Sequence, residues 1–199
     1  DVALISDAGM PGISDPGYEL VAAAIARGIR VEPLPGANAI LPALVGSGMA
    51  TDSFIYLGFL PKKSDHRAQV FADLQAETRT AVAYDSPHRI AETLAVLVEA
   101  LGAERPVCVA REISKMFEEF VRGTAAEVHA YFEETPPRGE ITLVIGGVSE
   151  DEAAWDEDRV RAALRQRLDA GESLSRAAKA VAAESGWKKR EVYALGTDG

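Results

Sequence analysis

The sequence predicts an α/β fold of two lobes with mixed sheets, followed by a small C-terminal helical segment. An apolar run at 2–5, a glycine- and proline-rich loop at 6–17 and an amphipathic run at 18–26 follow one another as strand, loop and helix. The same alternation of patterns recurs downstream. A length of 199 residues suits one large domain or two small ones. In open α/β sheets ligands bind beyond the carboxyl ends of the strands, where such loops lie.

Residues 1–50 are expected to form the remainder of an N-terminal α/β lobe. The Val2–Ile5 strand and the helix that begins at Tyr18 open it. A second strand at 29–34 follows the glycine that ends this helix, and together these elements make a right-handed βαβ unit. A second loop at 35–39 then lies at the same sheet edge, before a helix over about 40–45.

Residues 51–148 are expected to form the C-terminal α/β lobe. Three helical patterns separate its strands: one after Ser64, one from the 85–89 loop to about Gly102, and one that Thr124 caps and that runs to about Glu133. Some neighbouring strands are expected to be antiparallel, so the sheet is mixed. The predicted strands are Phe54–Phe59, Arg79–Tyr84, Val107–Arg111, Phe117–Arg122 and Glu140–Ile145.

Residues 149–199 are expected to form an acidic linker and a basic helical tail. The stretch 150–158 carries six acidic residues and no basic one, whereas 159–190 carries nine basic residues against three acidic ones, on a chain of net charge −10. Short helical patterns in the tail have the cadence of a helix-turn-helix. Its charge fits either an ordinary solvated helix face or a surface that meets RNA, and the composition leaves both open.

Composition also excludes several classes of protein. The single cysteine, Cys108, rules out an internal disulfide and fits a reducing cytoplasm, and its strand-like surroundings favour a buried apolar side chain. The three histidines have no metal-ligand spacing, so no metal is expected. No apolar run approaches the ~20 residues of a membrane span. A cytoplasmic protein is therefore expected.

The loop at 6–17 carries the main functional signal. Gly9, Gly12 and Gly17 permit backbone conformations closed to other residues and allow a ligand to approach the main chain. Asp15 is suited to cap the following helix, with Pro16 at its first position. The spacing matches neither the G-x-G-x-x-G dinucleotide fingerprint nor a phosphate-binding P-loop. By spacing alone, an ordinary turn between strand and helix remains an alternative.

The string Ser-Asp-Ala-Gly-Met-Pro-Gly-Ile-Ser-Asp-Pro-Gly closely resembles the signature loop of the tetrapyrrole-methylase superfamily. Its nearest match is the branch of 16S rRNA (cytidine) 2′-O-methyltransferases. Further motifs of this branch recur in order: Pro-Gly-Ala-Asn-Ala at 35–39, Gly-Phe-Leu-Pro at 58–61, Tyr-Asp-Ser-Pro-His-Arg at 84–89, Ala-Arg-Glu-Ile-Ser-Lys-Met-Phe-Glu-Glu at 110–119 and Arg-Gly-Glu at 138–140. Met10 stands where the family usually has Thr, and Asp85 where it has Glu.

This resemblance implies S-adenosylmethionine in a cleft between two lobes, usually in a homodimer, with 16S rRNA in the small ribosomal subunit as substrate. It places the cofactor against residues of both lobes: Ala8, Gly9, Met10, Pro11, Gly12, Ile13, Ser14, Asn38, Ala39, Asp85, Ile113, Gly139 and Glu140. A general base assists a ribose hydroxyl, and the candidates are His88, Glu112 and Glu118. Candidate RNA contacts are Arg89, Arg111 and Lys115 near the site, and Lys188, Lys189 and Arg190 in the tail.

Three alternatives to this interpretation of the residues and of the function remain open. His88 and Arg89 are equally suited to pack at a helix N-terminus, and Glu112 with Lys115 to form a local ion pair. A precorrin-type C-methyltransferase shares the implied architecture but needs an acceptor cleft for an acidic macrocycle. Family members also carry roughly another half-domain before the first motif, which forms one wall of the cofactor site. The chain is therefore expected to be truncated, and a fragment without catalytic activity is the third alternative.

Overall fold

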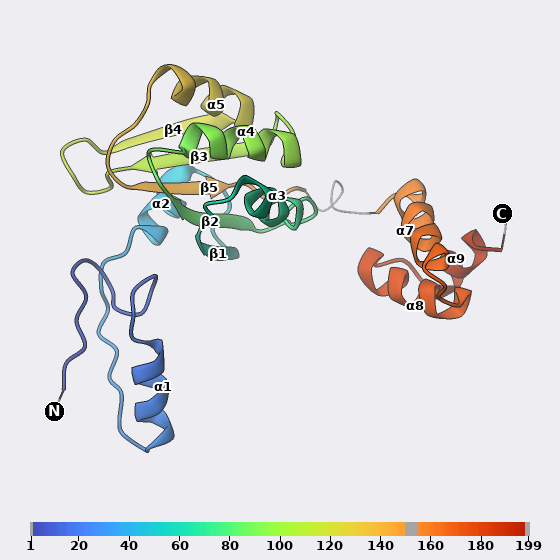
Figure 1. Cartoon of the computed structure of the whole chain (residues 1–199), viewed down its shortest axis with the longest axis horizontal. Coiled ribbons are helices and arrows are strands. Elements are labelled where there is room, and N and C mark those ends of the chain that lie inside the picture. Colours follow the sequence, from blue (N-terminus) through green and yellow to red (C-terminus); the bar gives the residue numbers. More distant parts are fainter. Residues whose placement is uncertain (1, 150–154, 198–199) are drawn as a thin grey trace. The chain divides into compact units, whose positions relative to one another are not determined.

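The computed structural model describes residues 2–149 and 155–197 (Figure 1). The chain divides into two compact units, Asp1–Gly147 and Val148–Gly199, which we describe separately. Most of the expected acidic linker, residues 150–154, lies outside the described residues. No helix in the described ranges is long and apolar enough to cross a membrane.

The first unit is built on a five-stranded mixed sheet with the strand order β1-β2-β5-β3-β4. β1 and β2 are parallel, whereas β5 is antiparallel to both β2 and β3, and β3 is antiparallel to β4. The predicted α/β class with a mixed sheet is confirmed. The strand bounds are β1 Phe54–Phe59, β2 Thr80–Asp85, β3 Pro106–Arg111, β4 Glu119–Thr124 and β5 Ile141–Ile145.

β5 lies in the middle of the sheet and determines where the loops meet. All of its residues are buried. Its first residue, Ile141, pairs with Asp85 at the end of β2 and with Arg111 at the end of β3. The loops that leave β1, β2 and β3 therefore emerge beside the segments that enter β4 and β5. We call this side of the sheet the carboxyl edge.

Helices cover both faces of the sheet (Figure 1). α3 (Ser64–Ala72), α4 (Ile90–Leu101) and α5 (Ala125–Glu134) pack on one face, around fully buried Leu94, Leu97 and Phe132. α2 (Ile40–Ser47) packs on the other face through Ala43 and Leu44. α5 begins with a capping box between Thr124 and Glu127, as its sequence predicts. These amphipathic helices shield a sheet whose central strands are apolar on both faces.

The predicted strands at 2–5 and 29–34 are wrong for the described chain, which has no strand before β1. Both segments are largely exposed, with Val2 at 93% and Leu34 at 78% exposure. An extended segment becomes a strand only when a neighbour pairs with its N–H and C=O groups, and no described segment pairs with these two. α1 (Tyr18–Ala26) forms as predicted but begins after Gly17, without a side-chain cap from Asp15.

Within residues 155–197, the second unit contains three helices, α7 (Glu157–Asp169), α8 (Leu174–Ser185) and α9 (Lys189–Leu195). They enclose a small core that includes fully buried Val160, Val181 and Val192. The indole N–H of Trp187 donates a hydrogen bond of 2.7 Å to the backbone carbonyl of Trp155, which ties the turn before α9 to the start of the unit. The predicted C-terminal helical segment is confirmed.

The burial of Cys108 predicts that its thiol does not react in the folded protein. It lies in β3, fully buried, and burial raises the pKa of its thiol to about 11. Because the thiolate is the reactive form, we expect no labelling of the native protein by a disulfide reagent at about pH 8, the ordinary cysteine range, and stoichiometric labelling in denaturant. Labelling of the folded protein at the rate of the unfolded chain would contradict this placement.

Candidate functional site

A cavity of about 500 Å³ lies at the carboxyl edge. One wall is the glycine-rich loop, and the opposite wall consists of strand ends. The loop and the neighbouring 37–39 segment contribute Asp7, Ala8, Gly9, Met10, Ile13, Ser14, Asp15, Ala37, Asn38 and Ala39. The sheet side contributes Phe59, Tyr84, Asp85, Pro87, Gly139, Glu140, Ile141 and Thr142. The volume is within the range of small-molecule sites.

The glycine-rich loop owes its shape to left-handed backbone at Gly9 and Gly12, whose φ angles are 78° and 82°. The amide of Met10 donates a hydrogen bond of 2.8 Å to the carbonyl of Ala37, which joins the two loops. A Cβ on Gly9 would lie 2.9 Å from that same carbonyl oxygen, so glycine is required there. The hydroxyl of Ser14 lies 2.5 Å from that of Tyr56 and links the loop to β1.

Aromatic side chains from β1 and β2 form a cluster at the sheet side of the cavity. The Tyr84 ring lies 5.5 Å from Tyr56 and 5.3 Å from Phe59, measured between centroids. Burial raises the pKa of Tyr84, so its hydroxyl stays protonated. Phe59, Tyr84 and Thr142 were not among the predicted site residues, because each has the character of an ordinary strand residue. Phe59 and Tyr84 do stand within the motifs at 58–61 and 84–89, whereas the only signal of Thr142 is its position near a strand end at this edge.

The predicted cofactor residues divide into two groups. Those that line the cavity are Ala8, Gly9, Met10, Ile13, Ser14, Asn38, Ala39, Asp85, Gly139 and Glu140. Pro11, Gly12 and Ile113 are not among the lining residues. The described residues contain no cluster of three or more His, Cys, Asp or Glu side chains arranged for a metal ion.

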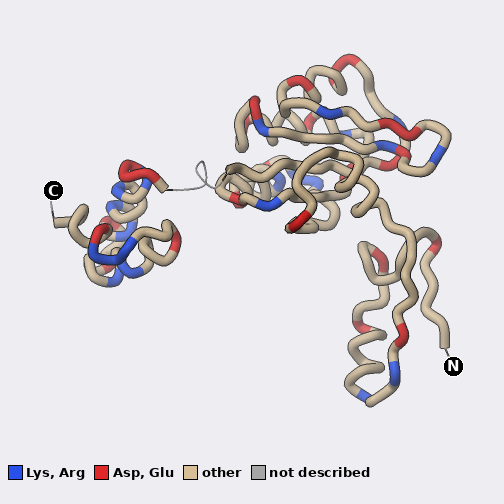
Figure 2. The backbone as a smooth tube through the Cα atoms, turned by 180° about the vertical axis from the view of Figure 1, so that it is seen from behind, with Lys and Arg blue, Asp and Glu red and all other residues tan. Residues whose placement is uncertain are grey.

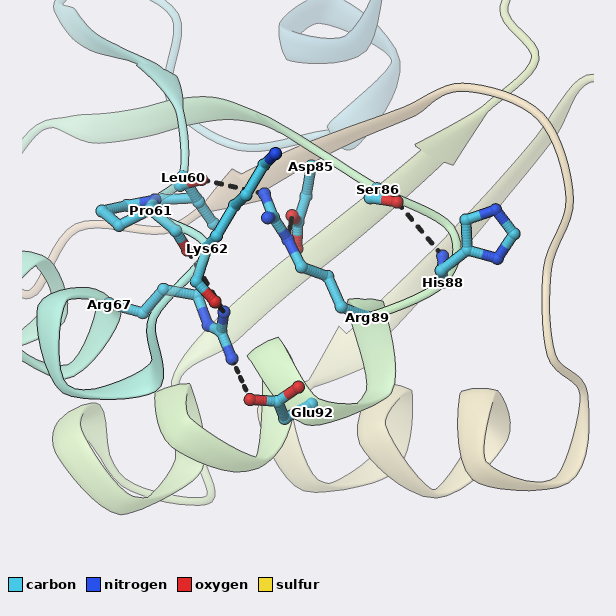
Figure 3. Close-up of polar contacts among 9 residues, drawn as sticks. All are labelled: Leu60, Pro61, Lys62, Arg67, Asp85, Ser86, His88, Arg89 and Glu92. Carbon is cyan, nitrogen blue, oxygen red and sulfur yellow. Dashed lines mark hydrogen bonds and ion pairs between the residues drawn. The ribbon is translucent and has the colours of Figure 1, made fainter.

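None of the three candidate bases lines the cavity. His88 is exposed at the start of α4, and its imidazole points away from Asp85 and Arg89 (Figure 3). Glu112 accepts hydrogen bonds of 2.9 Å from Lys115 and from the backbone N–H of Glu140; the Lys115 bond is the main reason its carboxyl pKa is lowered. Glu118 accepts a 2.6 Å hydrogen bond from the amide of Ser114. The two glutamates thus hold the β3–β4 turn in place.

The candidate RNA contacts near the site are engaged in ion pairs. Arg89 donates to Asp85 at 2.5 Å, Arg111 to Glu119 at 3.0 Å, and Lys115 to Glu112 and Glu140. These carboxylates offset much of the positive charge that would otherwise attract a phosphate. In the second unit, Lys188 lies 3.8 Å from Glu191, and Lys189 donates to Ser175, whereas Arg190 has no such partner among the described residues.

Two arginines fix the loop that follows β1 (Figure 3). Arg89 donates a hydrogen bond of 2.8 Å to the carbonyl of Leu60. Arg67 is fully buried and donates to the carbonyls of Pro61 and Lys62 at 3.1 and 2.8 Å, while its other terminal nitrogen pairs with Glu92 on α4. Three successive carbonyls are therefore held by guanidinium groups, which fixes the backbone of the loop that follows the cavity residue Phe59.

The Arg67 arrangement predicts an asymmetry in stability. Arg67→Met removes the donor to two part-buried carbonyls and a fully buried side chain's polar contacts, and we expect it to lower the free energy of unfolding by about 2–4 kcal/mol. Glu92 is 59% exposed, so Glu92→Gln should cost under about 1 kcal/mol. Urea denaturation of the two variants measures both effects. Equal losses would mean that the ion pair, and not the carbonyl contacts, matters at this position.

Comparison with known proteins identifies the family. Residues 1–129 match the model of the Tetrapyrrole (Corrin/Porphyrin) Methylases. The chain is 45% identical over 98% of its length to a Ribosomal RNA small subunit methyltransferase I of Synechocystis sp., of which it covers 70%. Proteins of the same name from Halalkalibacterium halodurans and Bacillus subtilis are 41% and 39% identical, over 96% and 97% of this chain and 68% of each relative.

Solved structures support the fold. The crystal structure of the methyltransferase CobJ matches 70% of this chain and 62% of its own with a TM-score of 0.52 at 18% identity. The conserved hypothetical protein APE0931 from Aeropyrum pernix K1 matches 94% of this chain and 65% of its own with a TM-score of 0.51 at 17% identity. The family model and the sequence relatives show that the chain belongs to the tetrapyrrole methylase family, within its ribosomal RNA small subunit methyltransferase I branch of S-adenosylmethionine-dependent enzymes.

Proposed function

We propose that this protein transfers a methyl group from S-adenosylmethionine to the ribose 2′-hydroxyl of a cytidine in 16S ribosomal RNA. The observation that carries the proposal is the identity of 39–45% over nearly the whole chain to proteins named for methylation of small-subunit ribosomal RNA. The particular nucleotide and the 2′-oxygen come from the motif resemblance. The cytoplasm as location and a homodimer as assembly remain predictions.

The cavity fits the methyl donor in size and in chemistry. The cavity of about 500 Å³ places the backbone of Ala8, Gly9 and Met10 along one wall, where a ligand can approach the main chain. Backbone amides of a glycine-rich loop suit the carboxylate end of an amino acid. We propose that the cluster of Tyr56, Phe59 and Tyr84 offers an apolar surface to the nucleoside part, and that Asn38 and Thr142 supply polar contacts.

Methyl transfer from S-adenosylmethionine needs little chemical assistance from the side chains. When bound, S-adenosylmethionine supplies a methyl group that its sulfonium already activates for in-line displacement. The protein then contributes alignment of the hydroxyl and exclusion of water. Lys115 holds Glu112 in its ionised form, which makes Glu112 a weak proton acceptor. Among the three candidate bases, we favour His88, whose ring makes no hydrogen bond to the described residues.

Transfer of a tritiated methyl group tests the proposed function. We expect incorporation into the RNA of small ribosomal subunits and none into uroporphyrinogen. Incorporation into the macrocycle alone would replace the proposal with the precorrin-type alternative. Donor binding by calorimetry tests the remaining alternative of a non-catalytic fragment, because a micromolar affinity, about −8 kcal/mol, would contradict it.

The loop geometry predicts a selective loss of donor binding. Gly9→Ala forces a side chain into a left-handed conformation and against the Ala37 carbonyl, so we expect at least tenfold weaker binding of S-adenosylmethionine, about 1.4 kcal/mol. Gly28→Ala is the matched control, because its φ of 69° imposes similar strain at the end of α1 without any atom within 4 Å. Calorimetry on both variants measures the difference. Equal weakening in the two would contradict a direct role for this loop.

A further inference from the structure

The cations of the first unit are not equally available to a ligand. In its described part, nearly all Lys and Arg side chains donate to a carboxylate or a backbone carbonyl. The three that make no such contact are Lys62, Lys63 and Arg138, and all three are exposed. An anion that approaches this part of the chain therefore meets uncompensated positive charge at these side chains.

These three cations lie in segments that continue from residues lining the cavity at the carboxyl edge. Lys62 and Lys63 come three and four residues after the cavity residue Phe59, and Arg138 directly precedes Gly139 and Glu140, which also line the cavity. The carbonyls held by Arg67 and Arg89 fix the backbone from which the lysines project. Figure 3 shows the Lys62 side chain pointing away from Arg67 and Glu92. The charges are thus presented from a rigid support (Figure 2 shows the distribution of charge along the backbone).

An exposed apolar tip lies at the same edge, in the turn between β3 and β4. Met116 and Phe117 are 90% and 65% exposed. Ion pairs of 2.9 Å from Lys115 to Glu112 and Glu140 hold the turn against the start of β5. A large aromatic side chain left in water on a fixed turn is suited to a partner that stacks on it.

We propose that the carboxyl edge binds a single-stranded segment of the RNA substrate, with its phosphates on Lys62, Lys63 and Arg138 and an unpaired base stacked on Phe117. Cations beside an exposed aromatic ring are the composition of single-strand binding surfaces, whereas duplex RNA is held by its phosphates and 2′-hydroxyls. At a strand spacing of ~4.8 Å, β1 and β4 are about 19 Å apart, a span of several nucleotides. This inference rests on the proposed function, and it identifies the residues that contact the RNA substrate.

In this arrangement Arg89 and Lys115 have positioning roles. Arg89 orients the loop that carries Lys62, and Lys115 orients the turn that carries Phe117. The sequence pattern assigned both cations to phosphates, but their carboxylate partners already offset their charge.

Binding of a fluorescein-labelled, mixed-sequence oligoribonucleotide of about 12 nucleotides tests the proposal by fluorescence anisotropy over a range of salt concentrations. The triple variant Lys62→Gln/Lys63→Gln/Arg138→Gln should bind at least about tenfold more weakly and lower the slope of log K against log salt by about 2. Phe117→Ala should bind about five- to a hundredfold more weakly with an unchanged salt slope, and Phe117→Trp should restore affinity. Single-stranded RNA should bind more tightly than a duplex of the same length.

The matched control is Arg27→Gln/Arg30→Gln/Arg79→Gln, which removes the same charge from positions outside the loop after β1 and the segment before β5, and it should leave the salt slope unchanged. Equal slopes in the two triple variants, tighter binding of the duplex, or a Phe117→Ala variant that changes only the oligomeric state would each overturn the inference. If the wild type methylates small subunits while the variants bind and act as well as it does, only this inference fails. A wild type that binds no RNA overturns the proposed function as well.

Discussion

The pairing of β5 with both β2 and β3 is the constraint on which the site depends. Ile141 pairs with both Asp85 and Arg111, so the ends of β2 and β3 lie level with the start of β5 at the same side of the sheet. A shift of one residue would turn the buried side chains of β5 to the opposite face. The register of this apolar strand therefore fixes which loops border the cavity.

Charge pairing then determines which groups at that edge are available. The chain carries 31 acidic and 21 basic residues, so an exposed cation readily finds a carboxylate. Arg89, Arg111 and Lys115 do so, and in each case the pair braces a loop or turn. Most of the positive charge at the carboxyl edge thus serves positioning, and recognition of an anionic substrate falls to the few cations that remain.

Much of the fold was predictable, because strands and amphipathic helices leave regular patterns. The strands from β1 to β5 appear close to where alternation and apolar runs predict them. The strands at 2–5 and 29–34 fail because their apolar pattern is local, whereas a strand requires a partner. At the site, the residue types of the glycine-rich loop made it predictable. Tyr84 and Phe59 lie in recognised motifs but have the character of strand residues, as does Thr142, so their place in the cavity wall was not predicted. The pair of Lys115 with Glu112 is a local i,i+3 contact that the sequence offered as an alternative to phosphate binding, and the structure confirms it. The second partner of Lys115, Glu140, and the contact of Arg89 with the Leu60 carbonyl depend on the tertiary fold, so the sequence could not show them.

Amide hydrogen exchange with and without S-adenosylmethionine tests most directly whether the carboxyl edge binds the donor. We expect slower exchange in the glycine-rich loop, in the 37–39 segment and at the start of β5, with little change in α7, α8 and α9. Protection confined to the C-terminal helices, or spread evenly over the chain, would contradict a donor site at this edge.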